Sequence, residues 1–238
     1  MGLIGDKMDT KIINLQDASI YQGEKQILRN LTFAINKGEF VYLIGKTGSG
    51  KSSLLRTLYA DLPWKEGTGT VVDYELQTLS RNKIPYLRRK IGIVFQDFQL
   101  FTDRNIAENL FFVMEATGWE NKQKMLKRMH FVLMQVGLEA AQHKMPHQLS
   151  GGEQQRIAIA RALINDPEII FADEPTGNLD PVIANEILDL FIKINQGGTA
   201  ILMATHHHSF IKRNPYRTLL CDNYELKDFA KDQISRKF

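Results

Sequence analysis

The chain of 238 residues contains a single cysteine, Cys221. One thiol excludes a framework of intrachain disulfides and fits a reducing compartment such as the cytoplasm. The sequence also lacks any apolar run near the roughly 18 residues that cross a membrane, and its first residues lack the apolar core of a signal peptide. If the protein works at a membrane, we therefore expect a partner to hold it there.

Neither sign of charge is in large excess, since 30 lysines and arginines face 27 aspartates and glutamates. A net charge of +3 does not by itself point to a nucleic-acid partner. The 43% hydrophobic and 24% charged residues are typical of a soluble globular protein. A chain of this length can bury a sizeable core, as one large domain or as a core with a subdomain.

The most informative stretch follows the apolar segment 40–44 and precedes helix-forming residues that begin at Lys51. It reads Gly45-Lys46-Thr47-Gly48-Ser49-Gly50-Lys51-Ser52 and is a complete phosphate-binding loop pattern, placed between a strand and a helix. Gly48 and Gly50 let the backbone bend around a phosphate, and the N–H groups that open the helix face the anion. Lys51 suits the β- and γ-phosphates, and the Ser52 hydroxyl suits Mg²⁺.

Polar residues also follow three other apolar segments that read as strands. Gln96 follows 91–95, Asp173 and Glu174 follow 168–172, and His206 comes directly after 199–204 and Thr205. Side chains at the carboxyl ends of parallel strands face the ligand crevice of an open α/β sheet. Taken alone, Gln96 and the acidic pair would more often be solvated strand ends; beside a phosphate loop, the acidic pair predicts a hydrolytic site.

The roles follow from the chemistry of these side chains. We expect Asp173 to hold the Mg²⁺ shell and Glu174 to polarise the attacking water as general base. Gln96 is placed to reach Mg²⁺ or that water, and His206 to hold the γ-phosphate or the water. The run His206-His207-His208 could also be interpreted as a metal site, but adjacent histidines rarely converge on one ion.

The segment from Asn105 to Val136 has apolar residues at helical spacing, with Gly118 dividing it into two parts. It predicts a helical insertion whose methionine-rich stripe forms a core. A further helix begins after Leu149, where Ser150 and Glu153 form a capping-box pattern. The neighbouring Gly151 and Gly152 expose backbone N–H groups, so this helix start is either a simple cap or a second anion site.

The remaining segments are less specific. Residues 11–18 and 31–35 read as strands broken by a turn at 22–24, and 217–221 reads as the last strand. Tyr21 either stacks on an adenine ring or is a half-buried tyrosine of an edge strand. Residues 1–10 are predicted as a loose lead-in, and 225–238 as a solvated helix or a frayed end. Strands that alternate with helices predict a mainly parallel α/β sheet.

The motifs together resemble the P-loop nucleotide-binding domains of ATP-binding cassette (ABC) proteins across nearly the whole chain. The matching positions are the adenine-stacking aromatic (Tyr21), Walker A (45–52, followed by Ser53), the Q-loop (Gln96), the signature (149–153), Walker B (169–173), the catalytic glutamate (Glu174), the D-loop (Asp180) and the switch histidine (His206). The resemblance implies one ABC ATP-binding domain over residues 11–238. It also implies an inserted helical and signature subdomain at about 97–165 and an antiparallel N-terminal β region.

The resemblance also assigns the site residues. It gives ATP-binding roles to Tyr21, Gly45, Lys46, Thr47, Gly48, Ser49, Gly50, Lys51, Ser52 and Ser53, catalytic roles to Lys51, Gln96, Glu174 and His206, and Mg²⁺ ligation to Ser52, Gln96 and Asp173. Two copies of such a chain dimerise head-to-tail around two ATP molecules. The signature residues Ser150, Gly151, Gly152 and Glu153 would then contact the nucleotide held by the partner chain, and Asp180 would help to join the two sites.

A narrower resemblance comes from segments 152–156, 172–180 and 84–97. They are similar to the branch of lipoprotein-release, macrolide-export and cell-division ATPases, and most like the cell-division members. This implies a peripheral ATPase at the cytoplasmic face of the plasma membrane, which drives an integral membrane partner resembling FtsX to regulate cell-wall hydrolysis. His207 and His208 depart from that branch.

Two other functions are compatible with the same catalytic residues. The chain could be the ATPase subunit of an exporter of lipoproteins or small molecules. It could also be a soluble ABC protein acting on DNA or ribosomes, but those usually carry two fused cassettes or a long coiled coil, and neither is present. We therefore expect no nucleic-acid partner. A scaffold that binds ATP without hydrolysing it is disfavoured because Glu174 and His206 are both present.

Overall fold

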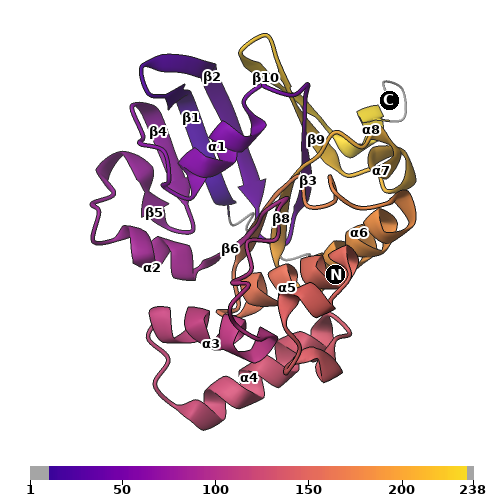
Figure 1. Cartoon of the computed structure of the whole chain (residues 1–238). Helices are drawn as coiled ribbons and strands as arrows, with labels where there is room; N and C mark the ends of the chain where they lie inside the picture. Colours follow the sequence, from indigo (N-terminus) through magenta and orange to yellow (C-terminus); the bar gives the residue numbers. More distant parts are fainter. Residues whose placement is uncertain (1–10, 235–238) are drawn as a thin grey trace, which may run out of the picture.

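The computed structural model describes residues 11–234, which form two β-sheets and a set of helices (Figure 1). The predicted lead-in, residues 1–10, and the last residues of the predicted tail, 235–238, lie outside the described residues. The architecture is the α/β class that the alternation of strands and helices predicts.

The larger sheet carries the strands that end at the candidate site. Its spatial order is β10 (Glu225–Phe229), β9 (Arg217–Asp222), β3 (Phe40–Ile44), β8 (Ala200–Ala204), β7 (Ile169–Asp173) and β6 (Ile91–Val94). The strands from β9 to β6 run parallel, and β10 pairs antiparallel with β9. All residues of β3 and β8 are buried, which is why these strands are apolar throughout rather than alternating.

The smaller sheet is antiparallel and confirms the predicted N-terminal β region. Its order is β2 (Lys25–Asn36), β1 (Lys11–Gln22), β4 (Glu66–Val71) and β5 (Tyr74–Glu75). The sequence predicts shorter strands at 11–18 and 31–35. Gly67 and Gly69 lie inside β4. A Cβ on Gly69 would clash with the Trp64 ring, so glycine here permits close contact within a strand.

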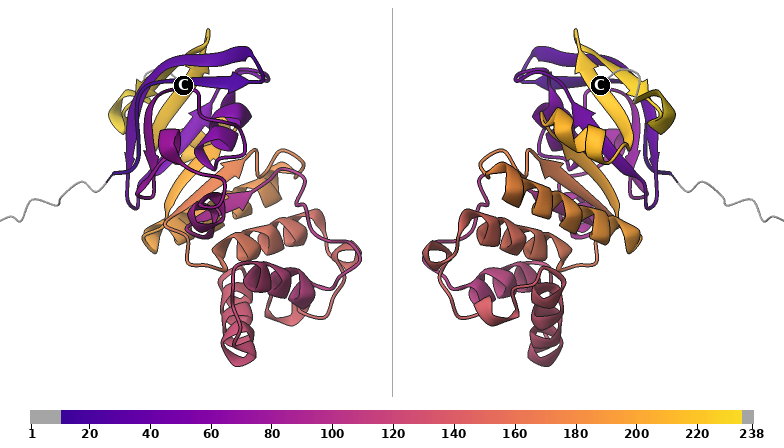
Figure 2. Two further views of the ribbon diagram at one scale, coloured as in Figure 1. Left: turned by 90° about the vertical axis from the view of Figure 1, so that its left-hand side faces the viewer. Right: turned by 90° about the vertical axis from the view of Figure 1, so that its right-hand side faces the viewer.

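The helices lie beside the sheets and at one end of the molecule (Figures 1 and 2). They are α1 (Lys51–Leu58), α2 (Ile84–Arg89), α3 (Ile106–Ala116), α4 (Lys122–Gln135), α5 (Gly151–Leu163), α6 (Pro181–Gln196), α7 (His208–Arg213) and α8 (Lys231–Ile234), with 3-10 turns at Leu76–Thr78, Glu139–Ala141 and Pro146–Gln148. In both views of Figure 2, α3 and α4 lie at the end of the molecule away from the smaller sheet. They fall within the predicted 97–165 subdomain, whose boundaries stay a prediction.

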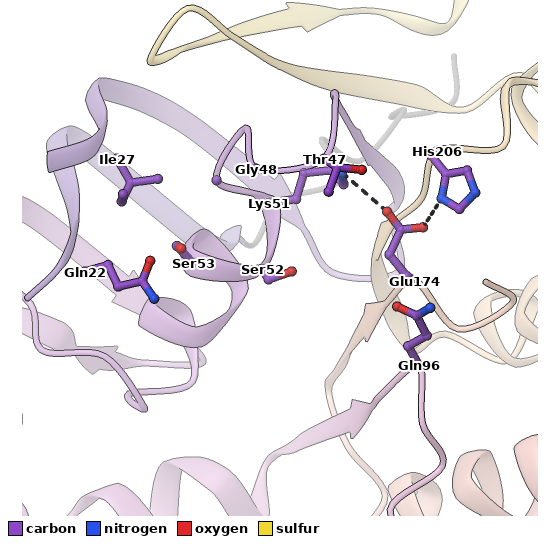
Figure 3. Close-up of a pocket in the computed structure, with 11 residues that line it drawn as sticks. Gln22, Ile27, Thr47, Gly48, Lys51, Ser52, Ser53, Gln96, Glu174 and His206 are labelled. Carbon is purple, nitrogen blue, oxygen red and sulfur yellow. Dashed lines mark hydrogen bonds and ion pairs between the residues drawn. The ribbon is translucent and has the colours of Figure 1, made fainter. Parts of the chain in front are cut away.

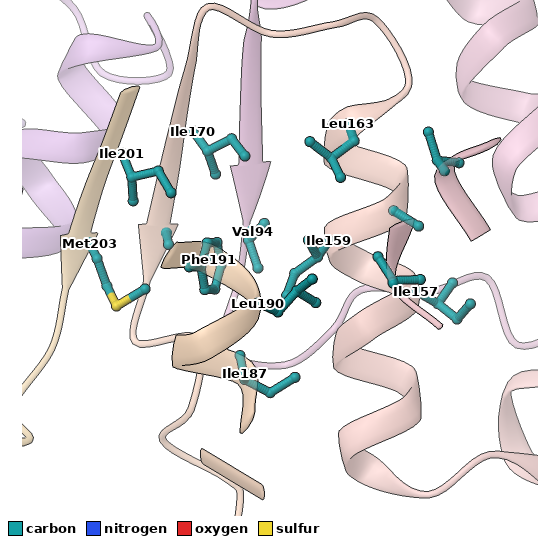
Figure 4. Close-up of a cluster of buried hydrophobic side chains, with 14 of the residues drawn as sticks. Val94, Ile157, Ile159, Leu163, Ile170, Ile187, Leu190, Phe191, Ile201 and Met203 are labelled. Atoms are coloured by element: carbon teal, nitrogen blue, oxygen red, sulfur yellow. The ribbon is translucent and has the colours of Figure 1, made fainter. Parts of the chain in front are cut away.

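The predicted methionine-rich core of the helical segment is confirmed, because Met114, Met125 and Met129 are all buried. A second layer of apolar side chains joins this segment to the larger sheet. In Figure 4, side chains of β6, β7 and β8 meet those of α5 and α6. The signature helix α5 is therefore fixed against the strands whose ends carry the candidate site.

The C-terminal region corrects the sequence prediction. The last strand is β10, not 217–221, and the segment predicted as a solvated helix or frayed end contains both β10 and the short α8. β10 is an edge strand, where charged side chains remain in solvent and pair with the neighbouring strand. Lys227 bonds Asp222 at 2.8 Å, and Asp228 accepts two hydrogen bonds from Arg217 at 2.6 and 2.9 Å. The charged residues of β10 hide the apolar alternation by which a strand is recognised in a sequence.

Candidate active site

The parallel strands β3, β6, β7 and β8 bring the predicted site residues to one edge of the larger sheet (Figure 3). There they surround a cavity of about 420 Å³. The lining residues are Gln22, Ile27, Thr47, Gly48, Gly50, Lys51, Ser52, Ser53, Gln96, Glu174 and His206. Four of the segments that sequence reasoning selected, far apart in the chain, thus meet at one cavity.

The loop between β3 and α1 has the geometry of an anion cradle. Gly48 and Gly50 have φ angles of 81° and 103°, which side chains other than glycine rarely adopt. No side chain caps the start of α1 and no acidic residue lies in its first turn, whereas α3, α4, α5 and α6 each have a side-chain cap. The first-turn N–H groups of α1 are therefore without a side-chain acceptor and suit a phosphate.

Glu174 connects the loop lysine to the histidine after β8. Its Oε1 atom lies 3.3 Å from Lys51 Nζ, and its Oε2 atom lies 2.7 Å from His206 Nδ1. The Glu174 backbone N–H donates to the Ala204 carbonyl at 3.0 Å, which ties the end of β7 to β8. Glu174 also has a φ of 48°, so the chain leaves β7 by a turn that directs this side chain into the cavity (Figure 3).

Ser52, which lines the cavity, is joined to Asp173, which does not: Ser52 Oγ donates to Asp173 Oδ1 at 3.0 Å. Burial raises the pKa of Asp173 above its ordinary value, while the Ser52 hydrogen bond and Lys51 act in the opposite direction. A buried carboxylate in this state gains from a nearby cation. Hydroxyl, carboxylate and amide oxygens are ligands that Mg²⁺ accepts, so this group fits the predicted metal site.

Gln96 is fixed by a partner that the sequence does not reveal. Its Nε2 donates to Asn178 Oδ1 at 3.0 Å, and Asn178 Nδ2 donates back to the Gln96 carbonyl at 3.2 Å. Asn178 lies in the loop between β7 and α6. The Q-loop and the D-loop are thereby joined side by side within one chain.

Several predicted residues lie away from the cavity. Gly45, Lys46 and Ser49 belong to the loop but do not line it. Tyr21 does not line it either: its hydroxyl donates to Glu66 at 2.8 Å, and Lys65 lies 5.0 Å from its ring centre. The adenine-stacking role of Tyr21 stays a prediction.

The signature residues and Asp180 are also absent from the cavity of their own chain. Ser150 and Glu153 form the predicted capping box at the start of α5, and Asp180 caps α6, whose first residue is Pro181. A Cβ on Gly152 would lie 2.5 Å from Ile183 Cγ2 of α6. Glycine at 152 therefore lets the two helix starts approach closely.

Sequence reasoning missed Gln22 and Ile27, which line the cavity from β1 and β2. Ile27 lies so close to the loop that a Cβ on Gly50 would stand 2.7 Å from its Cγ2 atom. No local pattern marks either residue, because both reach the loop only through packing of the smaller sheet against it.

Across residues 11–234, no helix is long and apolar enough to span a membrane.

Comparisons with known proteins show which family this chain is similar to. The model of the ABC transporter family matches residues 28–177. The cell division ATP-binding protein FtsE of Streptococcus pneumoniae is 40% identical over 213 residues, which cover 89% of this chain and 92% of that protein. FtsE of Escherichia coli is 39% identical over 199 residues, with coverage of 84% and 89%.

Solved structures show the same fold. CbiO1 of Clostridium perfringens, part of an ABC transporter complex, superimposes with a TM-score of 0.86 at 26% identity, covering 96% of this chain and 92% of that one. A dimeric post-hydrolysis state of the ATP-binding cassette MJ0796 with ADP and Pi gives a TM-score of 0.80 at 31% identity, with coverage of 92% and 98%. The chain therefore belongs to the ABC transporter family of ATP-hydrolysing cassettes, in its group of FtsE cell division ATP-binding proteins.

Proposed function

We propose that two copies of this chain close head-to-tail on two Mg-ATP molecules and reopen after hydrolysis. The observation that carries this proposal is that the phosphate loop and the start of α5 do not share a cavity within one chain. The phosphate loop lines the cavity of its own chain, whereas the signature residues Ser150, Gly151, Gly152 and Glu153 do not. A second copy would bring its α5 N-terminus to the γ-phosphate, and Asp180 would link the two sites. Shared phosphate contacts then favour closure only while ATP is present.

Hydrolysis is assigned to the residues that meet at the cavity. Lys51 neutralises charge on the transferring phosphoryl group, Glu174 orients the attacking water, and His206 supports Glu174 and the γ-phosphate. Ser52, Asp173 and Gln96 would hold Mg²⁺, which supplies charge neutralisation at the phosphate oxygens. Glu174 Oε1 lies 3.3 Å from Lys51 Nζ, so a phosphate bound by Lys51 would compete with this carboxylate for the lysine.

The test is the Glu174→Gln variant, which keeps the size of the side chain and removes its charge. We expect phosphate release to fall by at least about 100-fold and Mg-ATP to trap a dimer measurable by light scattering after gel filtration. Ser150→Arg should prevent that dimer while leaving ATP bound to the monomer. Wild-type turnover by the Glu174→Gln variant would refute the assignment of Glu174.

The membrane partner is proposed to dock in a groove of about 540 Å³ beside the Q-loop. Phe101 and Phe112 line it, are 39% and 40% exposed, and meet edge to face at 4.8 Å. Arg161 of α5 lines the groove as well and donates to the backbone carbonyls of Phe98 and Gln99. An apolar helix in this groove would contact residues joined both to the Q-loop and to the signature helix.

We propose that this helix belongs to a membrane protein resembling FtsX, and that the complex regulates cell-wall hydrolysis in division. The FtsE relatives support this choice. The partner would hold the chain, as one domain over 11–238, at the cytoplasmic face of the plasma membrane. An export ATPase would use the same catalytic residues, so the partner that co-purifies from membranes decides between the two functions.

The docking test uses Phe101→Ala with Phe112→Ala. We expect this variant to keep basal ATPase activity and lose co-purification of the membrane partner. Phe131→Ala is a matched control, because Phe131 is 44% exposed on α4 and does not line the groove. Normal assembly of the double variant would place the dock elsewhere. Phe98 is left out of this test, because it is half-buried and does not line the groove.

A further inference from the structure

His207 lies between the exposed histidine of the candidate site and the core of the protein. Its ring centre is 4.4 Å from that of His206, with 30° between the planes, and 5.0 Å from that of Phe210, with 35° between the planes. Phe210 is 2% exposed, whereas the side chain of His206 is 56% exposed. The three rings thus contact one another in a row, with tilted planes, from a core residue to the edge of the cavity.

Hydrogen bonds fix the backbone of His207, which carries the middle ring of this row. The His207 N–H donates to Thr205 Oγ1 at 3.0 Å, and its carbonyl accepts from the Phe210 N–H at 3.1 Å. Thr205 is fully buried, and its own N–H donates to the Leu43 carbonyl of β3 at 3.0 Å. His207 is therefore tied to the same strand that leads into the phosphate loop.

The environment of His207 suits a neutral aromatic plane. Its Nε2 atom is buried and has no hydrogen-bond partner within residues 11–234. Burial, and then the neighbouring His206, lower the pKa of His207, so the neutral ring is favoured. His207 does not line the cavity, so we expect its side chain to act on the site through its contact with His206 rather than by proton transfer.

We propose that His207 is a positioning residue that holds the His206 ring in place against Glu174. This inference rests on the proposed role of His206 and Glu174 in hydrolysis. An exposed histidine samples several rotamers, and only some keep Nδ1 at 2.7 Å from Glu174 Oε2. A ring packed on one face of His206 removes the others, which keeps the water-orienting carboxylate preorganised.

The test compares His207→Leu, which fills the space without an aromatic plane, with His207→Phe, which keeps the plane. We expect kcat of the leucine variant to fall by about 3- to 10-fold, the range that follows from the energy of one aromatic pair. The phenylalanine variant should stay within about 2-fold of wild type. KM for ATP should be unchanged in both, because His207 does not line the cavity. His143→Ala, an exposed histidine in the loop before α5, is the control.

Thermal unfolding of each variant checks that the fold is intact, and NMR of the His206 ring supplies a second readout. Stacking on an aromatic plane shifts the ring protons of His206, so this shift should survive in His207→Phe and vanish in His207→Leu. Equal rates for leucine and wild type, or equal losses for leucine and phenylalanine with an intact fold, would overturn the proposal. If His206→Ala and Glu174→Gln also hydrolyse ATP at the wild-type rate, the proposed function fails as well. If these two variants are slow while the His207 variants behave like wild type, the inference about His207 alone fails.

Discussion

Gly45 and Gly48 offer a matched pair of alanine substitutions within one loop. Both have positive φ angles, 151° and 81°, so alanine at either position carries a backbone strain of about 1–2 kcal/mol. Their surroundings differ. A Cβ on Gly45 would stand 2.5 Å from Ser49 Oγ and 2.6 Å from the Cys221 carbonyl oxygen, whereas a Cβ on Gly48 would meet nothing within 4 Å.

The clash at Gly45 adds overpacking of about 1–3 kcal/mol to the strain, and part of it falls on backbone that cannot rotate away. We therefore expect the free energy of unfolding to fall by about 1–2 kcal/mol in Gly48→Ala and by about 2–5 kcal/mol in Gly45→Ala. With about 2–4 °C per kcal/mol for a domain of this size, a packing cost near 2 kcal/mol places Gly45→Ala about 4–8 °C below Gly48→Ala.

Thermal unfolding without nucleotide measures this difference, and ATP binding separates structure from function. Gly48 lines the cavity, so we expect a methyl group on it to compete with a bound phosphate for space. Gly48→Ala should remain folded and bind ATP at least about 10-fold more weakly. A Gly48→Ala protein that melts at or below Gly45→Ala would refute the packing argument, and one that binds ATP like wild type would refute the phosphate cradle.

Three further predictions concern side chains around the site and the sheet. Because burial raises the pKa of Asp173, its charge destabilises the free protein above that pKa; Asp173→Asn should raise Tm at pH 7.5, and the gain should shrink as pH falls towards 4. A constant gain across that range would contradict this sign. Arg217→Ala removes a partly buried guanidinium that pairs with the partly buried Glu39 at 3.0 Å and with the exposed Asp228, and should cost about 1–3 kcal/mol, measured by urea unfolding. Equal stability to wild type would count against it. Asn178→Ala frees Gln96 and should raise the Mg²⁺ concentration needed for half-maximal ATPase activity, with no such shift arguing against Gln96 at the metal.

Much of the candidate site could be predicted because its motifs are short and consist of residues close together in the sequence. The loop pattern needs only a strand, glycines and a lysine in sequence, and the capping box of Ser150 and Glu153 needs only a spacing of three residues. Parallel strands end at one edge of a sheet, so Gln96, Glu174 and His206 could be brought together without knowing their distances. The element boundaries were less certain, as β4 and β10 show, because glycines and charges within a strand conceal its pattern.

By itself the sequence determined the phosphate loop, the order of the strand-end residues and the residues that cap α5 and α6. Only the tertiary structure decided that Ile27 lines the cavity, that Tyr21 bonds Glu66 outside it, and that the ring of His207 contacts that of His206. Local patterns depend on neighbours along the chain and recur wherever the backbone has the same geometry. Contacts between distant segments depend on how whole elements pack, and no spacing in the sequence records that packing.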